Sequence, residues 1–324
     1  MHLEPDEHRH HNRVHGSTAA TVRDRWYLCR PLSHHQVPTN KNQMRILNLG
    51  GGVQSTTLYL MAMRGEIDPI QCAIFADLGE EPKSVYAHME WLKSLGGPTI
   101  HVVSAGILGN DLIHGINSKG RSTVFSKSGD RFASIPAFTA MNEGEPLGKT
   151  RRQCTSDYKI VPIERFIRRE LLGLAKGQRI KTKLTQIFGI SLDEAGRATR
   201  IKSNCPHWSE PEFPLCDKMM TRADCVKWLE TFGTPHTVPR SACVFCPYKS
   251  NHEWLLLRET DPEGWARAVE IDDALRVEGT VCNRGMKEKL YIHKSCRPLK
   301  EVHLTDNERG QSEFNLECEG GCAL

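Results

Sequence analysis

The sequence predicts an α/β protein with a doubly wound, mostly parallel sheet and a cysteine-rich C-terminal region. Three observations support this fold class. Short apolar segments typical of buried strands alternate with helical segments, a glycine-rich turn joins the first strand to the first helix, and most cysteines lie in the later part of the chain. With 324 residues, 39% of them hydrophobic, the chain can bury one α/β core and leave a smaller appended region.

The glycine-rich turn lies within residues 45–60, RILNLGGGVQSTTLYL. Gly50, Gly51 and Gly52 permit positive φ angles and a close approach of the backbone to a ligand, and hydroxyl residues open the helix that follows. Unpaired N–H groups and the positive end of the helix dipole would attract a phosphate. The stretch contains no lysine, which excludes the phosphate loop of kinases and GTPases. The glycine turn can therefore be another kind of phosphate loop or a purely structural turn.

A second apolar segment, Pro69–Ala76, follows the first helix and predicts a β-α-β unit with parallel strands. Asp77 ends this segment at the carboxyl edge, where ligands of parallel sheets bind, and could contact a ribose hydroxyl or a magnesium ion. Glu80 and Glu81 follow it. An acidic N-cap for a helix over Pro82–Leu95 explains these two residues at least as well as a ligand does.

Thr99–Val103 and Leu184–Ile190 predict further strands. Between them, Ser104–Lys149 is rich in Gly, Ser, Lys and Arg, which fits a functional lid and a flexible surface loop equally well. The later strand runs into Asp193 and Glu194, and the first turn of a helix would explain these acids without a function.

The C-terminal half predicts four helices. The first is amphipathic and opens at Pro162, the second begins at Thr221, and two more cover Asn251–Arg258 and Pro262–Arg276. The chain then becomes polar and basic from residue 284 to residue 297. Such a run is usually a solvated face, although it could also approach a phosphate backbone.

Twelve cysteines in a chain of this type predict metal binding or redox chemistry rather than disulfides. Cys243 and Cys246 form a C-x-x-C turn, which can place two sulfurs on one metal ion or cluster. Cys154 follows two arginines and precedes Lys159, and such cations favour a thiolate. A buried structural cysteine at position 154 is equally plausible.

Taken together, the motifs between residues 45 and 254 resemble the PP-loop adenine nucleotide α-hydrolase superfamily, and within it the phosphoadenylyl-sulfate and adenylyl-sulfate reductases. Reductases of the adenylyl-sulfate type join a Cys-Cys pair, followed by a lysine and a proline, to a distant C-x-x-C. Cys154, Lys159 and Pro162 match the first motif here, and the C-x-x-C turn matches the second. Gln153 stands where that family has its other cysteine.

The resemblance implies a four-iron four-sulfur cluster that lacks one of its usual ligands. We expect Cys225 to supply it, with Cys216 and Cys205 as alternatives. The expected metal ligands are Cys154, Cys225, Cys243 and Cys246. Zinc is the alternative to iron, because four thiolates in a tetrahedral arrangement suit both.

The resemblance also implies an adenine nucleotide as ligand, either ATP or an adenylyl sulfate, with or without magnesium. The residues expected to hold it are Gly50, Gly51, Gly52, Gln54, Ser55, Thr56 and Asp77. Lys159 and Arg197 are expected at the catalytic site, and Arg200 is a further candidate for binding the anion.

The C-terminal tail, FNLECEGGCAL, is similar to the Glu-Cys-Gly segment that carries the nucleophilic cysteine of these reductases. Cys318 is therefore the predicted nucleophile, and a thiol reductant protein is the partner that would regenerate it. A structural or metal-binding tail is the alternative, because the acids on both sides of Cys318 would raise its pKa.

The predicted function is PP-loop chemistry on an adenine nucleotide linked to sulfur, similar to sulfonucleotide reduction. The first alternative is ATP-dependent sulfur insertion into tRNA or DNA, which Gln153 and the basic C-terminal region favour. The second is a regulatory protein that binds a nucleotide or a metal without turnover. The formal net charge of +4 does not choose between these classes.

We expect four regions along the chain. Residues 1–43 form a histidine-rich, largely disordered extension in which a metal site is the alternative, 44–200 the PP-loop domain, 201–260 a cysteine-rich metal or cluster region, and 261–324 a helical and basic region with the cysteine tail. No apolar run is long enough to span a bilayer and the N-terminus lacks the apolar core of a signal peptide, so we expect a cytoplasmic protein. The sequence leaves the oligomeric state open.

Overall fold

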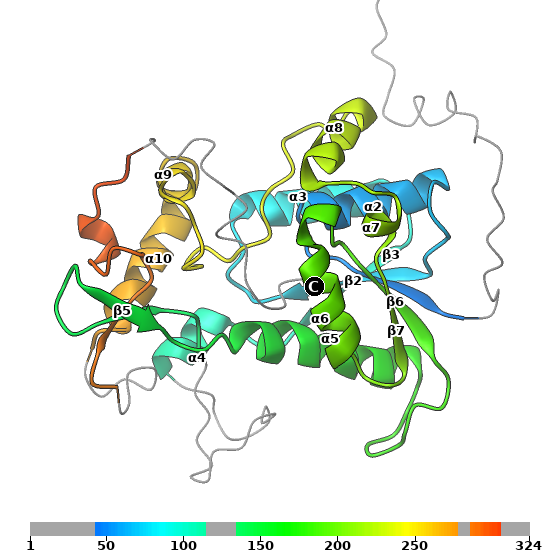
Figure 1. The fold of residues 1–324 in the computed structure, drawn as a ribbon, viewed down its shortest axis with the longest axis horizontal. Helices are drawn as coiled ribbons and strands as arrows, with labels where there is room; N and C mark the ends of the chain where they lie inside the picture. Colours follow the sequence, from blue (N-terminus) through cyan, green and yellow to red (C-terminus); the bar gives the residue numbers. More distant parts are fainter. Residues whose placement is uncertain (1–42, 115–133, 278–285, 306–324) are drawn as a thin grey trace, which may run out of the picture. The chain divides into compact units, whose positions relative to one another are not determined.

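A five-stranded parallel sheet lies at the centre of the computed structural model, which describes residues 43–114, 134–277 and 286–305 (Figure 1). Its strands, in the order β3-β2-β1-β6-β7, are β3 (Thr99–Ser104), β2 (Cys72–Asp77), β1 (Arg45–Asn48), β6 (Leu184–Phe188) and β7 (Ser209–Glu212). Every neighbouring pair is parallel, which confirms the predicted α/β class and its mostly parallel sheet. The chain leaves β1 toward one edge and later returns to β6 on its other side, so a topological switch point lies between β1 and β6.

Helices cover both faces of the sheet, because alternate side chains of each strand point to opposite sides. Leu47 and Phe75 pack with α2 (Val53–Arg64), α3 (Lys83–Ser94) and α8 (Arg222–Phe232) on one face. Ile46 and Ile74 pack on the other face with α5 (Val161–Phe166) and the π-helical turn that follows it, η2 (Ile167–Leu171). A second π-helical turn, η1 (Ser156–Ile160), precedes α5. Figure 1 shows α2 and α5 on opposite sides of the strands.

Helix α2 is buried along most of its length, with nine of its twelve residues in the interior. It begins at Val53, two residues before Ser55, the first of the hydroxyl residues predicted to open it, because Gly52 already has the extended backbone of an N-cap. It ends at Gly65, whose left-handed conformation, φ 73°, favours glycine.

A second core lies around Trp254, whose side chain is fully buried. It joins α4 (Leu108–His114), α9 (Asn251–Thr260) and α10 (Pro262–Ala274), and the last two confirm the helices predicted there. A small antiparallel sheet in the order β5-β4-β8 packs beside them, built from β4 (Phe138–Ala140), β5 (Pro146–Lys149) and β8 (Lys289–Tyr291).

Several elements differ from the sequence-based prediction. The small sheet and β7 were not predicted, because their strands are short and β7, Ser-Glu-Pro-Glu, is polar. A hydrogen bond from Ser209 to Gln186 and the ion pair of Glu212 with Arg45 hold β7 in the sheet.

The remaining elements of the described residues are η3 (Leu192–Glu194), α6 (Ala195–Asn204), α7 (Pro214–Asp217) and η5 (Leu299–Glu301).

Some predictions fall on residues that the structure does not describe. They concern the histidine-rich extension up to residue 42, part of the lid segment at 115–133, and the tail that carries Cys318. All described residues belong to one compact unit of the chain. Within them, no helix combines the length and apolar character needed to cross a bilayer.

Gly189, directly after β6, lies against the backbone of the first turn of α2. A Cβ at this position would be 2.7 Å from Ser55 N and 3.0 Å from Ser55 Cα, so the backbones would have to separate. We expect Gly189→Ala to lower the free energy of unfolding by about 1–3 kcal/mol. Gly196→Ala is the matched control, because nothing lies within 4 Å of its Cβ position and alanine favours the helix. Urea denaturation measures both; equal effects of the two changes would contradict the close approach.

Candidate functional site

The glycine turn lies at the switch point, immediately after β1. Gly51 has φ 77°, a conformation that a residue with a Cβ rarely adopts. The turn is held from inside by Ser55, whose Oγ accepts a hydrogen bond from Gly50 N at 3.2 Å and donates one to Gly52 O at 3.2 Å. Ser55 therefore fixes the shape of the turn that it follows.

The turn leads into the N-terminus of α2, where no side chain caps the helix and no acidic residue occupies the first turn. Main-chain N–H groups at such a terminus lack intrahelical partners, and the helix dipole makes their surroundings electropositive. The arrangement suits an anion such as a phosphate or sulfate group. Gly50, Gly51 and Gly52 are thus placed as a phosphate loop requires, and nucleotide binding there remains a prediction.

Gln54 and Arg197 meet through Glu194, beside the first turn of α2. Gln54 Nε2 donates to Glu194 Oε2 at 3.0 Å, and Arg197 forms an ion pair with the same carboxylate. Arg222, from the start of α8, donates to Gln54 Oε1 at 3.2 Å. The structure therefore places Arg197 near Gln54, through Glu194, with its guanidinium bound to a carboxylate, and its catalytic role remains a prediction.

Thr56 lies behind the turn and has no exposed surface. Its hydroxyl forms a hydrogen bond of 2.9 Å with His88 Nε2, and His88 Nδ1 forms another of 2.9 Å with His236 Nε2. Burial, reinforced by the neighbouring His236, lowers the pKa of His88 to about 4. Thr56 thus anchors α2 to α3, and its role in binding a ligand directly remains a prediction.

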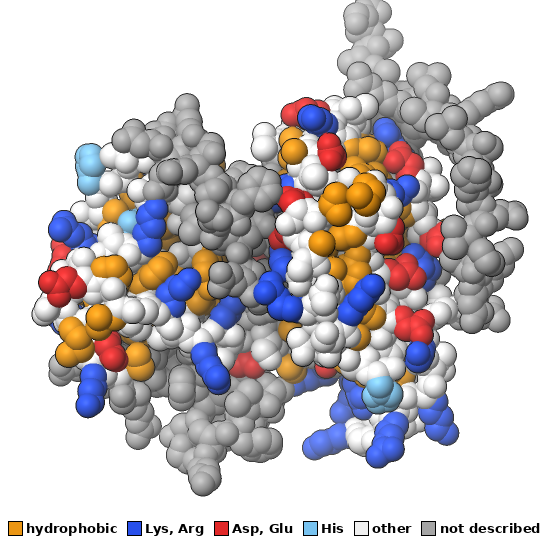
Figure 2. Space-filling view, viewed as in Figure 1, with side chains coloured by type: hydrophobic (Ala, Val, Ile, Leu, Met, Phe, Trp, Pro, Cys, Tyr) orange, Lys and Arg blue, Asp and Glu red, His pale blue; other side chains and the backbone are white. Residues whose placement is uncertain are grey.

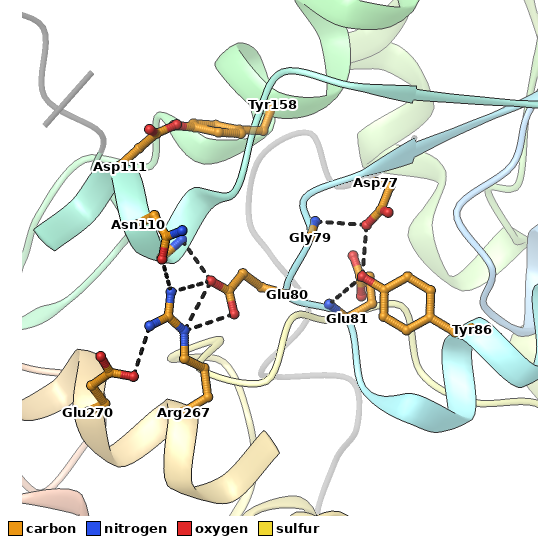
Figure 3. A network of polar contacts seen from close by, with 11 residues as sticks. Asp77, Gly79, Glu80, Glu81, Tyr86, Asn110, Asp111, Tyr158, Arg267 and Glu270 are labelled. Atoms are coloured by element: carbon orange, nitrogen blue, oxygen red, sulfur yellow. Dashed lines mark hydrogen bonds and ion pairs between the residues drawn. The ribbon is translucent and has the colours of Figure 1, made fainter. Parts of the chain in front are cut away.

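The acidic residues after β2 have separate roles (Figure 3). Asp77 Oδ1 accepts hydrogen bonds from Gly79 N at 2.7 Å and from the Tyr86 hydroxyl at 3.0 Å. Glu80 is held by Arg267 of α10, with a shortest contact of 2.8 Å. Neither Glu80 nor its neighbour Glu81 caps α3, because the N-cap of that helix is Pro82 and its first turn contains no acid. The interpretation of Glu80 and Glu81 as an acidic N-cap is therefore wrong.

Glu81, for which the sequence left a ligand role and an N-cap role open, is buried in a way that the sequence did not predict. It is 5% exposed, and both carboxylate oxygens are buried without a hydrogen-bond partner among the residues that the structure describes. The nearest cation is Lys159 of η1, whose Nζ lies 4.0 Å from Oε1. Burial raises the pKa of Glu81, and the charge of Lys159 opposes that rise. The only sequence signal was the position of this acid just after a buried strand.

Three of the predicted metal ligands interact with one another near Glu81. The Cys243 thiol donates a hydrogen bond to Cys246, which raises the pKa of Cys243 and lowers that of Cys246. Arg240 and Lys249 further favour the Cys246 thiolate. Cys154 lies within electrostatic range of both sulfurs, and its own pKa is raised by burial despite the opposing charge of Arg152. The site thus combines three thiols with several cations.

The cysteine turn and the glycine turn adjoin. Val244 N, inside the C-x-x-C sequence, donates to Glu80 O at 2.8 Å and ties the cysteine turn to the end of β2. On the other side, a Cβ on Gly52 would lie 3.5 Å from Ser241, two residues before Cys243. The segment from Pro239 to Cys246 therefore connects the predicted phosphate loop to the three thiols.

Cys225 lies elsewhere, inside the core between α2 and α8. Its thiol forms a hydrogen bond with Thr57, and burial raises its pKa to about 12, so it remains a neutral thiol. The structure does not bring it to Cys154 and the C-x-x-C turn, which contact a different core. Across the described ranges, no three His, Cys, Asp or Glu side chains are placed to hold a metal ion. The four-cysteine set is thus not assembled in the structure.

No protein-family model matches this chain, and no curated protein matches it significantly. The resemblance described from the sequence therefore rests on its motifs alone.

The buried His88 predicts a loss of stability in acid. Its pKa is about 4 in the folded protein and near 6.5 when the chain is unfolded, so the unfolded chain binds the extra proton between these values. The stabilising effect is complete above pH 6.5 and disappears as the pH falls to about 4, a change on the order of 3 kcal/mol. Urea denaturation across this range should show a smaller decline for His88→Gln than for the unaltered protein.

The matched control is His207→Gln, because His207 is exposed. This variant should retain the decline of the unaltered protein. An undiminished decline in His88→Gln would show that His88 does not carry the effect.

Proposed function

We propose that this protein is an enzyme that binds an adenine nucleotide, ATP or an adenylyl sulfate, and performs sulfur chemistry on it in the manner of PP-loop proteins related to phosphoadenylyl-sulfate reductase. The supporting observation is that an uncapped glycine turn lies at the switch point of a parallel sheet, in contact with the segment that carries two cysteines.

The residues of this chain would divide the work. The main-chain N–H groups of residues 51–55 would hold the anionic group of the nucleotide, because Gly50 N already donates to Ser55 Oγ, and the cysteine turn would cover it. Lys159 would stabilise negative charge that develops on the leaving group, because its ammonium is largely withdrawn from water. Glu81, 4.0 Å away, would hold Lys159 in place. Cys318 remains the proposed nucleophile of a reductase, with a thiol reductant protein as its partner.

Three cysteines are suitable ligands for a metal ion or an iron–sulfur cluster, because Cys154, Cys243 and Cys246 interact with one another and nearby cations favour their thiolates. These cations are Arg152, Lys159, Arg240 and Lys249. It does not fit as a four-cysteine site, since Cys225 belongs to another core. A cluster would store electrons for reduction, whereas zinc would have a structural role. Both remain proposals.

ATP-dependent modification of tRNA or DNA is the second candidate function. It uses the same nucleotide loop but requires a surface for a polyanion. Exposed cations between residues 165 and 183, described in the next subsection, favour it.

Gly52→Ala tests the nucleotide loop. An added Cβ has only ordinary contacts, 3.5 Å from Ser241, so the fold should persist, but the methyl group would narrow the gap between the glycine turn and the segment that carries Ser241, where we place the anionic group. We expect ATP or adenylyl sulfate to bind at least about tenfold more weakly, measured by isothermal titration calorimetry. Gly196→Ala should bind as the unaltered protein does. Unchanged affinity in Gly52→Ala would exclude this loop as the phosphate site.

Products assign the reaction class. Sulfite and AMP from adenylyl sulfate in the presence of a dithiol would establish reduction. Release of AMP and pyrophosphate from ATP would establish activation of another substrate. Nucleotide binding without either set of products would leave a regulatory protein and contradict the enzyme proposal.

The cysteine centre predicts a specific pattern of metal content in protein purified without oxygen. Single serine substitutions of Cys154, Cys243 and Cys246 should lower bound iron or zinc, measured by mass spectrometry, whereas Cys225→Ser should retain it because Cys225 is remote. Absorption near about 400 nm would identify an iron–sulfur centre. An equal loss of metal in Cys225→Ser would show that all four cysteines bind it. If the unaltered protein contains no metal, the three cysteines form a thiol site and the metal proposal is contradicted.

A further inference from the structure

The segment of residues 165–183 concentrates positive charge far beyond the chain average. It contains seven Lys or Arg residues and one acidic residue, for a net charge of +6, whereas the whole chain carries +4. The rest of the chain is therefore slightly acidic. Figure 2 shows Lys and Arg side chains gathered at the lower right, where the loop before β6 emerges in Figure 1.

This segment is ordered by its own contacts. Arg168 donates to Gln178 O at 2.6 Å, and Ala175 N donates to Gln178 Oε1 at 3.0 Å, so the loop closes on itself. Ile180 is buried in the core beneath the sheet, and Leu174 packs against that core. Lys176, Arg179 and Lys181 thus project from a fixed turn, whereas Arg165 and Arg169 lie on α5 and η2.

Five of the seven cations are exposed and have no carboxylate partner within the described residues. They are Arg165, Arg169, Lys176, Arg179 and Lys181. Lys183 differs, because it pairs with Glu210 at 2.9 Å. Holding like charges together on a fixed loop is unfavourable unless an anion neutralises them. The five side chains therefore form a surface, the basic loop, that is complementary to a polyanion.

The composition of the basic loop favours a polyphosphate over a bilayer. Segments that lie on membranes combine cations with exposed apolar side chains that enter the lipid. No large hydrophobic side chain of this segment is exposed, since its leucines and isoleucines pack inward. What remains is a set of cations without apolar anchors, as in sequence-independent contacts to a phosphodiester backbone.

The position of the loop is compatible with a substrate that reaches the site. The basic loop precedes β6 at the amino edge of the sheet, and the glycine turn lies at the carboxyl edge. The two are separated by roughly the length of β6, about 15 Å. A nucleic-acid stem spans this distance, so its backbone can rest on the loop without competing for the nucleotide.

We propose that the basic loop binds the phosphodiester backbone of a nucleic acid, which is the macromolecular substrate of the site. Its assignment as substrate rests on the second candidate function, ATP-dependent modification of a nucleic acid, whereas the binding itself does not. The same phosphate chemistry occurs in RNA and DNA, and the test below separates them.

Fluorescence anisotropy with the full-length protein measures binding to a labelled RNA stem-loop and to a DNA duplex of equal phosphate number, from about 0.05 to 0.2 M salt. The test variant replaces Lys176, Arg179 and Lys181 by glutamine, exposed positions for which no side-chain hydrogen bond holds the loop together. We expect affinity to fall about tenfold or more at 0.1 M salt, and the slope of log K against log salt to decrease by about 2 to 3.

The matched control removes the same charge elsewhere, with Lys287, Lys289 and Arg297 replaced by glutamine, all exposed in the basic C-terminal region. It should retain most of the affinity. A loss of nucleic-acid binding in the test variant alone supports the proposal. Tighter binding of the unaltered protein to RNA or to DNA identifies the substrate class. Equal or greater loss in the control would overturn it, as would the absence of binding to either nucleic acid or binding to phosphatidylserine vesicles instead.

Titration of ATP into the same proteins separates the two proposals. Both triple variants should bind ATP as the unaltered protein does, since neither change touches the glycine turn. Nucleic-acid binding through the loop without ATP binding would refute the nucleotide chemistry and leave the loop assignment intact. ATP binding without nucleic-acid binding would refute the loop assignment and leave the nucleotide chemistry intact.

Discussion

The burial of polar side chains at the start of α2 is the constraint on which the site depends. Gln54, Ser55, Thr56 and Thr57 all lie in the interior, where an unpaired polar group would be costly. Each therefore recruits a different partner: Glu194 before α6, the glycine turn, His88 of α3, and the main chain of α2 itself. The helix that presents its N-terminus to a ligand is thus also the point at which the surrounding elements are fixed.

The acidic segment after β2 links the two cores of the structure. Glu80 joins the end of β2 to α10 through Arg267, and its carbonyl accepts the N–H of Val244 in the cysteine turn. Its neighbour Glu81 points instead toward Lys159 and the thiols. Glu80 thus provides the connection that holds the region in place. Glu81 provides a buried carboxyl group whose oxygens have no hydrogen-bond partner in the described part of the chain, a costly feature that is typical of functional sites.

The sequence was sufficient for the parallel sheet, the glycine turn and the C-x-x-C turn, because each depends on local pattern. It failed for Cys225, since a cysteine on the apolar side of a helix has the same local pattern whether it packs in a core or binds a metal. It failed for Glu81, because burial of a charge is decided by elements far along the chain. Strand β7 was missed since parallel pairing with β6, not its polar composition, makes it a strand.

The strand order has a consequence for how the chain folds. β1 pairs with β2, where Ile46 meets Cys72, 26 residues on, but its partner on the other side is β6, where Arg45 is paired with Thr185, 140 residues on. During synthesis that second edge of β1 stays open until β6 has emerged, and an open strand edge can pair with another chain. Contacts between such distant residues also slow folding. This protein is therefore expected to depend on chaperones or on slow translation while the central strand waits for its partner.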